Sequence, residues 1–229
     1  MKNTLVVIPA RGGSKGVPGK NIKLLNSKPL IQYTVDVARS LFSDQQIIVS
    51  TDDEQIINVV KNLGLNVPFT RPAELATDTA STYEVLLHAM QYAEQSGIQF
   101  DKVLLLQPTS PFRTQINIEE AFTLYHENLD MVVSVKETKS NPYYVLFEED
   151  AHGFLVKSKQ GNFTRRQDCP QVWEYNGAVY IMNKSRLKLA PPSAFTQIKK
   201  YVMNEFESHD IDTLMDWVIA EHLIKHNTN

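Results

Sequence analysis

The chain of 229 residues contains a single cysteine, Cys169. One thiol cannot form an internal disulfide and cannot supply a zinc site of four thiolates, so both kinds of cross-link are excluded. The sequence also lacks any run of about 18 apolar residues, the length that spans a bilayer, because the apolar run 4–8 ends at Pro9. We therefore expect a protein of the reducing cytoplasm that works without a membrane.

Acidic residues are absent from the first 35 positions, although the whole chain has a formal net charge of −3. Those 35 residues carry six basic side chains, and the rest of the chain has a net charge of −9. A basic segment at one end of an acidic protein indicates a local anion site, not a nucleic-acid groove spread over a whole face. The content of 21% charged residues, with 11 prolines and 9 glycines, also excludes disordered, collagen-like and low-complexity classes.

Strand and helix patterns alternate along most of the chain. Short unbroken apolar runs are typical of strands buried on both faces of a parallel sheet, and segments with apolar residues at helical spacing follow them. The predicted strands are 5–8, 47–50, 103–106, 131–135 and 178–182, and the predicted helices are 30–42, 53–63, 83–96, 116–127 and 211–225. This alternation predicts an α/β fold with a mostly parallel sheet and right-handed crossovers.

The alternation stops between residues 137 and 174, where the chain is polar and interrupted by proline and glycine. Short strands and turns of this kind are typical of a flap or a dimerisation arm. We therefore divide the chain into an α/β domain, residues 1–136 and 175–229, and an inserted segment, residues 137–174. The last helix is predicted to bury one apolar stripe, made of Ile211, Leu214, Met215, Val218, Ile219 and Leu223.

A basic, glycine-rich loop follows the first predicted strand and reads IPARGGSKGVPGKN over residues 8–21. Ligands of open α/β sheets bind beyond the carboxyl ends of the strands, and glycines let backbone amides approach them closely. Arg11 can grip phosphate oxygens with two parallel hydrogen bonds, while Lys15 and Lys20 act as point charges. The loop therefore predicts a phosphate site, against the alternative of a plain solvated turn.

The spacing of this loop disfavours two common nucleotide motifs. A Walker A loop has four residues between its glycines and a hydroxyl residue after its lysine. Here five residues separate Gly13 from Gly19, and Asn21 follows Lys20. The dinucleotide motif Gly-x-Gly-x-x-Gly is absent as well. P-loop kinases, ATPases and dehydrogenases are therefore disfavoured.

Asp210 and Asp212 stand just before the last predicted helix. Aspartate is favoured at helix N-caps, so the pair could serve the helix alone. One cap needs one aspartate, however, and an extended backbone would let both carboxylates converge on Mg²⁺, which takes one or two carboxylates plus substrate phosphates. At another strand end, Asp53 could cap the next helix, and Asp52 is a weaker candidate for the metal or nucleotide site.

Five ordered motifs resemble those of the sugar-acid cytidylyltransferases, in particular the acylneuraminate family, which includes the CMP-sialic acid synthetases. Besides the glycine loop they are RPAELA and DTAS in residues 71–81, LQPTSPFR in residues 106–113, RQDCP and NGAVYI in residues 166–181, and HDIDT in residues 209–213. The resemblance covers nearly the whole chain. It implies a Rossmann-like sheet of the nucleotide-diphospho-sugar transferase type. It also implies Mg²⁺-dependent transfer of CMP from CTP to the anomeric hydroxyl of an acylneuraminate-type nine-carbon keto sugar acid, with release of pyrophosphate.

The resemblance implies roles for individual residues as well. The catalytic set is Arg11, Lys15, Lys20, Asp210 and Asp212, of which the two aspartates bind Mg²⁺. The nucleotide-binding set is Ala10, Arg11, Gly12, Gly13, Ser14, Lys15, Lys20, Asn21, Arg71, Ala80 and Ser81. The sugar-side set is Gln107, Arg166, Tyr180 and Phe195. Each member of the sugar-side set has a structural alternative, as a loop cap, a surface ion pair or part of the core.

Members of this family are typically homodimers, which implies that the segment 137–174 crosses to a partner. The sugar acid stays open, because Tyr144 stands where some sialate-activating members carry lysine. The alternatives are a bacterial relative such as legionaminate or pseudaminate, 3-deoxy-manno-octulosonate, and a nucleotide-binding module without catalytic activity. No histidine or glutamate of the sequence stands out as a general base.

Overall fold

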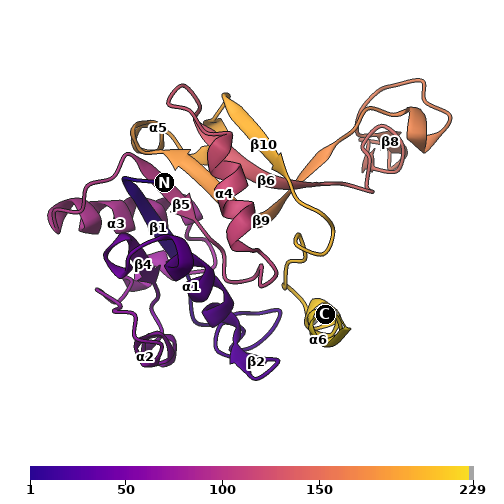
Figure 1. Cartoon of the computed structure of the whole chain (residues 1–229). Helices are drawn as coiled ribbons and strands as arrows, with labels where there is room; N and C mark the ends of the chain where they lie inside the picture. Colours follow the sequence, from indigo (N-terminus) through magenta and orange to yellow (C-terminus); the bar gives the residue numbers. More distant parts are fainter. Residues whose placement is uncertain (227–229) are drawn as a thin grey trace.

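A six-stranded sheet forms the centre of the computed structural model, which describes residues 1–226 (Figure 1). In spatial order its strands are β10 (Ile198–Val202), β6 (Met131–Glu137), β9 (Trp173–Asn183), β5 (Lys102–Leu105), β1 (Thr4–Pro9) and β4 (Ile47–Ser50). β1 is parallel to β4 and β5, and β10 is parallel to β6. β9 runs antiparallel to both of its neighbours. The sheet is therefore mostly parallel, as the sequence predicted.

The predicted helices form close to their expected positions. They are α1 (Leu30–Leu41), α2 (Glu54–Asn62), α3 (Thr82–Gln95), α4 (Gln115–Thr123) and α6 (Leu214–His226), joined by an unpredicted short α5 (Lys184–Leu189). The smaller elements are β2 (Leu24–Leu25), β3 (Lys28–Pro29), η1 (Asp44–Gln46), η2 (Ala73–Leu75) and η4 (Pro192–Ala194). None of the helices within the described residues has the length and apolar character needed to cross a bilayer.

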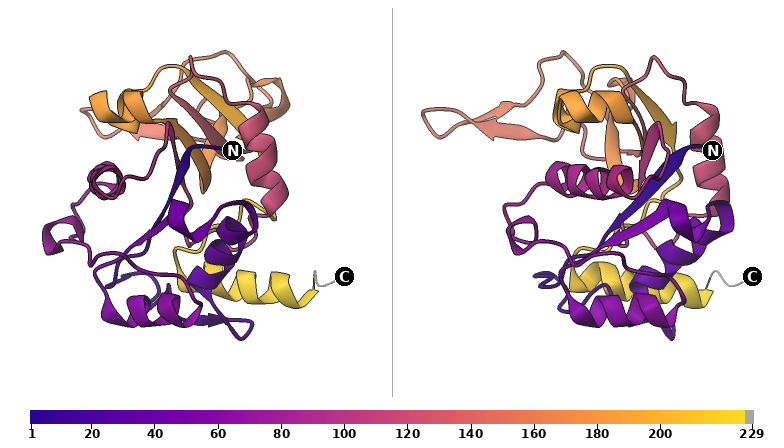
Figure 2. Two further views of the ribbon diagram at one scale, coloured as in Figure 1. Left: turned by 60° about the vertical axis from the view of Figure 1, so that its left-hand side comes forward. Right: turned by 90° about the vertical axis from the view of Figure 1, so that its left-hand side faces the viewer.

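Alternate residues of β1 enter two separate cores. Val6 and Ile8 belong to a cluster with residues of α1, α2 and α4, whereas Leu5 and Val7 belong to a cluster with residues of α3. All four side chains are 0% exposed, which explains why the strand is apolar without alternation. The sheet is thus covered by helices on both faces (Figure 2).

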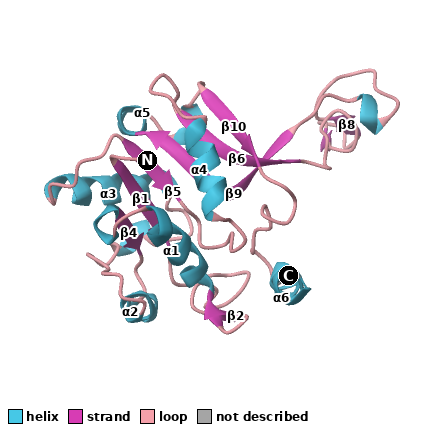
Figure 3. Ribbon diagram, in the orientation of Figure 1, coloured by secondary structure: helices cyan, strands magenta, loops and turns pink. Residues whose placement is uncertain are grey.

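Between β6 and β9 the chain leaves the sheet as a projecting arm, residues 138–172 (Figures 1 and 3). The arm contains a hairpin of β7 (Phe147–Glu149) and β8 (Leu155–Lys157), followed by η3 (Arg166–Asp168). It lies within the predicted insertion 137–174, whose first residue pairs with Trp173 in the sheet. Its exposed large apolar side chains are Val145, Leu146, Phe147, Phe154, Leu155 and Val156.

The burial predicted for the last helix is wrong for four of its six residues, whereas Ile211 and Leu223 pack as predicted. α6 begins at Leu214, and four residues of the predicted stripe are exposed: Leu214, Met215, Val218 and Ile219. The side chains that α6 buries are Trp217 and Ala220, which pack with Val17 of the glycine loop and Leu25 of the β2–β3 hairpin. The helix docks on this small loop surface and not on the sheet, so a different face of it is covered.

Candidate active site

A pocket of about 420 Å³ opens beyond the carboxyl ends of β1 and β5. Its volume lies within the range of about 300–1,000 Å³ that small-molecule sites have. The predicted site residues that line it are Arg11, Ser14, Lys15, Lys20, Asn21, Arg71, Ala80, Gln107 and Asp212. The structure thus brings together residues from four of the five sequence motifs at one edge of the sheet.

Three hydrogen bonds hold the glycine loop at the carboxyl end of β1. The amide of Ala10 donates to the carbonyl of Ser50 at 2.9 Å, and the amide of Gly12 donates to Asp52 Oδ1 at 3.0 Å. Asn21 closes the loop by donating from its Nδ2 to the carbonyl of Arg11 at 3.0 Å. Asp52 therefore supports the loop. Its neighbour Asp53 caps α2 by accepting hydrogen bonds from two backbone amides of that helix.

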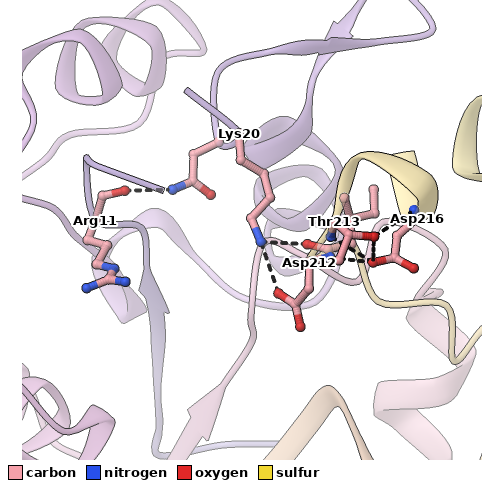
Figure 4. Close-up of polar contacts among 7 residues, drawn as sticks. Arg11, Lys20, Asp212, Thr213 and Asp216 are labelled. Carbon is pink, nitrogen blue, oxygen red and sulfur yellow. Dashed lines mark hydrogen bonds and ion pairs between the residues drawn. The ribbon is translucent and has the colours of Figure 1, made fainter. Parts of the chain in front are cut away.

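Lys20 connects this loop to the carboxylate pair (Figure 4). Its side chain is buried, its Nζ donates to the carbonyl of Ile211 at 2.5 Å, and the same nitrogen lies 3.2 Å from Asp212 Oδ1. The backbones are close as well, since a Cβ added to Gly16 would lie 2.0 Å from the carbonyl oxygen of Asp212. Residue 16 must therefore be glycine for the loop to reach this position.

The carboxylate pair does not cap α6. Thr213 takes that role: the amide of Asp216 donates to Thr213 Oγ1 at 3.2 Å, and the amide of Thr213 donates back to Asp216 Oδ2 at 2.7 Å (Figure 4). The segment before the helix is held by the amide of Ile211, which donates to the carbonyl of Thr109 at 2.9 Å. Neither Asp210 nor Asp212 is therefore needed as the cap of α6.

The donor set of this pair fits Mg²⁺. Asp210 Oδ1 is buried and has no hydrogen-bond partner among the described residues. Burial is the largest influence and raises the pKa of Asp210; the nearby Thr109 hydroxyl lowers it, and the charge of Asp212 raises it. A buried, unpaired carboxylate oxygen is costly unless a ligand satisfies it. Within residues 1–226 no group of three or more His, Cys, Asp or Glu side chains is placed to hold a metal, so phosphate oxygens and water would complete the coordination shell.

Arg71 also lines the pocket and is 5% exposed. Its Nη2 donates to the carbonyl of Ser50 at 2.5 Å and its Nε donates to Ser50 Oγ at 3.0 Å. Burial lowers the pKa of Arg71. Ser81 has a structural position, because its hydroxyl caps α3 by accepting from the amide of Glu84 at 3.2 Å.

The sugar-side residues lie near Asp210 to different degrees. Gln107 lines the pocket, and Gly177, with φ of +77°, brings β9 close to it: an added Cβ would lie 3.4 Å from Gln107 Oε1 and 3.6 Å from Asp210 Oδ1. Burial, followed by the charge of Asp210, raises the pKa of Tyr180 to about 12. Phe195 is part of the apolar cluster against which Tyr180 packs. Both aromatic residues therefore have core contacts.

Arg166 is not brought to the pocket of its own chain. It lies in η3 of the arm and lines a separate cavity of about 330 Å³ with Glu137, Thr138 and Asn141. The arm that carries η3 projects away from β1 and β5 (Figure 1), and Arg166 is not among the residues that line the pocket at the ends of those strands.

Two residues of the site region were not assigned a role from the sequence. Asp78 pairs with two loop cations, with its Oδ1 2.9 Å from Arg11 Nη1 and its Oδ2 2.5 Å from Lys15 Nζ. Arg113 is 2% exposed and donates from Nη1 to the carbonyl of Ala178 at 2.7 Å, and burial lowers its pKa to about 9. Both belong to motifs noted in the sequence, but Arg11, Lys15 and Ala178 are remote from them along the chain.

The fold and the site together define a nucleotidyltransferase. The sheet presents a glycine loop with three cations to a pocket that Asp212 also lines, and Asp212 pairs with one of those cations, Lys20. The chain belongs to the cytidylyltransferase family, whose family model matches residues 5–216.

Known proteins resemble the chain over nearly its whole length. It is 37% identical over 227 residues to the CMP-N,N'-diacetyllegionaminic acid synthase of Legionella pneumophila. The aligned region covers 97% of this chain and 97% of that relative. It is 36% identical over 228 residues to the N-acylneuraminate cytidylyltransferase of Streptococcus agalactiae, covering 97% of the chain and 52% of that relative. The solved structure of a CMP:2-keto-3-deoxy-manno-octonic acid synthetase complexed with CTP matches with a TM-score of 0.72 at 17% identity, covering 98% of this chain and 99% of that one. This last likeness confirms the fold.

Proposed function

We propose that the chain transfers CMP from CTP to the anomeric hydroxyl of a nine-carbon 2-keto sugar acid and releases pyrophosphate. The observation that carries this proposal is the contact between Lys20 of the glycine loop and Asp212 of the carboxylate pair, in a pocket that Arg11 and Lys15 also line. Cations for a triphosphate and carboxylates for its metal thus lie side by side. The cytidylyltransferase family supports CTP as the nucleotide.

In this reaction the anomeric oxygen forms a bond to the α-phosphorus while the bond from that phosphorus to the bridging oxygen of the β-phosphate breaks. The leaving pyrophosphate gains negative charge. Arg11, Lys15 and Lys20 line the pocket where they can neutralise this charge. Positioning and charge neutralisation supply most of the catalysis in such transfers.

Asp210 and Asp212 are the residues that would hold Mg²⁺, and the unpaired Oδ1 of Asp210 supports this assignment. When bound, the ion would neutralise charge on the α-phosphate and lower the pKa of the attacking hydroxyl. The described lining of the pocket contains neither histidine nor glutamate. The proposal therefore assigns no general base to those residue types.

For the sugar acid, an acylneuraminate is the substrate implied by the sequence motifs. Gln107 lines the pocket and can contact the sugar acid there, whereas Tyr180 and Phe195 pack in the neighbouring apolar cluster. A diacetylated legionaminate is the second candidate. Two observations favour it: Tyr144 replaces the lysine of some sialate-activating members, and the legionaminic acid synthase matches over 97% of both chains.

We also place the reaction in the cytoplasm, given the single cysteine, and in a homodimer. Exposed apolar side chains on the arm and on the outer face of α6 support an association between copies. A second copy's arm would bring its Arg166 to the sugar side of this pocket. Co-expressed Arg166→Ala and Asp212→Asn chains should then recover about a quarter of wild-type activity, because mixed dimers contain one intact site. No recovery in mixed dimers, or a monomer in sedimentation velocity, would contradict this arrangement.

The activity is tested by measuring pyrophosphate released from CTP and Mg²⁺ in the presence of single sugar acids. The panel is N-acetylneuraminate, N,N'-diacetyllegionaminate, pseudaminate and 3-deoxy-manno-octulosonate. Sugar-dependent release with a nine-carbon acid supports the proposal, and the highest kcat/KM identifies the substrate. Release with 3-deoxy-manno-octulosonate alone would move the activity to that sugar, and CTP binding without turnover on any acid would leave a nucleotide-binding module.

A further inference from the structure

Asp78 lies at the edge of the nucleotide pocket and holds two of its three loop cations. Its carboxylate bridges Arg11 and Lys15, at 2.9 and 2.5 Å respectively. The neighbouring carbonyl of Thr77 accepts a further hydrogen bond from Arg11 Nη1 at 3.1 Å. Both Thr77 and Asp78 line the pocket. The segment between η2 and α3 therefore reaches across to the glycine loop.

The charge on Asp78 is stabilised by these contacts. The Lys15 ammonium, together with Arg11, holds the pKa of Asp78 below its ordinary value, so the side chain is an anion at neutral pH. The proposed function assigns Arg11 and Lys15 to the terminal phosphates of CTP. A carboxylate and a phosphate cannot occupy the same donors, and they repel each other at this distance.

We propose that Asp78 is a built-in competitor for these phosphates. It pairs with Arg11 and Lys15 in the free protein, is displaced by CTP or pyrophosphate, and pairs with them again when pyrophosphate leaves. CMP lacks the β- and γ-phosphates, so its binding leaves the contacts of Asp78 with Arg11 and Lys15 intact. Asp78 thereby weakens the binding of polyphosphates selectively and favours pyrophosphate release. This inference rests on the proposed function, because it takes the glycine loop as the triphosphate site.

The local structure allows such an exchange. The side chain of Asp78 is 48% exposed, so moving it away from the cations uncovers no core. Its segment has internal hydrogen bonds, such as that from the amide of Ala80 to Thr77 Oγ1 at 3.1 Å, and is anchored where Ser81 caps α3. Lys20, whose partner Asp212 lies on the other side of the pocket, is outside this exchange.

Calorimetric titration with inorganic pyrophosphate, without sugar acid, tests the inference directly. Asp78→Asn should bind pyrophosphate about three- to tenfold more tightly than wild type, a modest gain because both ion pairs are partly exposed. Its affinity for CMP should change by less than about twofold, because neither ion pair has to break. The gain should shrink at high ionic strength, since salt screens exposed charges. A merely structural role for Asp78 predicts none of these changes.

Two variants serve as controls. Asp78→Glu keeps the charge and should behave like wild type. Asp44→Asn removes an equivalent carboxylate, paired with Arg39 at the opposite edge of the sheet, and should leave pyrophosphate binding unchanged.

Unchanged or weaker pyrophosphate binding by Asp78→Asn would overturn the inference, as would an equal gain for CMP. Absence of pyrophosphate binding in every variant would overturn it too. These outcomes can be told apart from a failure of the proposed function, which is recognised by the absence of pyrophosphate release with every sugar acid. A chain inactive on the whole panel can still show the Asp78 effect on pyrophosphate.

Discussion

The ammonium of Lys20 lies 3.2 Å from the carboxylate of Asp212, a residue 192 positions later in the chain. The contact joins the basic amino-terminal loop to the acidic segment before α6. It is reinforced by the bond from the same ammonium to the carbonyl of Ile211 at 2.5 Å. The triphosphate-binding and metal-binding parts of the proposed site are therefore one connected unit.

Asp212→Asn tests the metal-binding part of this unit. The substitution preserves shape but removes one of the two carboxylates available to Mg²⁺, so turnover should fall by about 100-fold or more. The thermal midpoint should change little, because the Asp212 side chain is 72% exposed. Asp36→Asn is a matched control, since Asp36 pairs with Lys28 outside the pocket. Undiminished turnover of the Asp212→Asn variant at low magnesium concentration would show that Asp212 does not bind the metal.

Arg11→Ala should weaken the use of CTP. Loss of a charge-assisted contact to phosphate predicts a rise of about tenfold in KM for CTP, with a smaller effect on the sugar acid. Arg39→Ala is the matched control, because Arg39 also pairs with an aspartate but lies outside the pocket. Steady-state kinetics with CTP as the varied substrate measure the difference. Equal CTP kinetics in the two variants would exclude Arg11 from the nucleotide site.

Gly16→Ala should impair catalysis while leaving the fold in place. The new methyl group would lie 2.0 Å from the carbonyl oxygen of Asp212, so the loop must move away from the carboxylate pair. A displacement of this size predicts a loss of about 100-fold in kcat/KM. Gly16 is exposed, so circular dichroism and the thermal midpoint should stay close to wild type. Full activity would show that the loop and Asp212 separate during turnover.

The hydrogen bonds that Asp130 accepts predict that the folded protein becomes less stable in acid. Its carboxylate accepts amide hydrogen bonds from Gln197 and Thr196, at 2.9 Å each, and these hold its pKa below the ordinary value. A depressed folded-state pKa stabilises the fold above about pH 4, and this contribution disappears as the pH falls through the lowered pKa.

Asp130→Ala should therefore lower the free energy of unfolding at neutral pH by about 2 kcal/mol. Urea denaturation at neutral and acid pH measures whether the difference from wild type narrows in acid. Asp36→Ala, which breaks an exposed pair with Lys28, should cost less than about 1 kcal/mol. A difference that is independent of pH would assign the Asp130 effect to packing.

The buried strands could be read from the sequence because their signal is local. Leu5, Val6, Val7 and Ile8 are all fully buried, and a strand covered on both faces has no polar alternation. Glycine loops, caps and strand ends are likewise encoded within a few residues, so the loop at residues 8–21 was placed correctly at the end of β1.

The burial of α6 could not be read in the same way. Its apolar residues occupy more than one face, and the sequence does not state which face meets a neighbour. The glycine loop and hairpin cover Trp217 and Ala220, leaving Met215 and Val218 exposed. Which stripe is buried is decided by the docking surface, which belongs to other parts of the chain.

By itself the sequence determined the α/β class and the glycine loop with its three cations at the end of the first strand, since each depends on neighbouring positions. Only the tertiary structure decided which charges meet. It pairs Lys20 with Asp212 and Arg11 with Asp78. The physical reason is that electrostatic interactions depend on distance in space, and spatial distances between remote residues are set by how strands and helices pack.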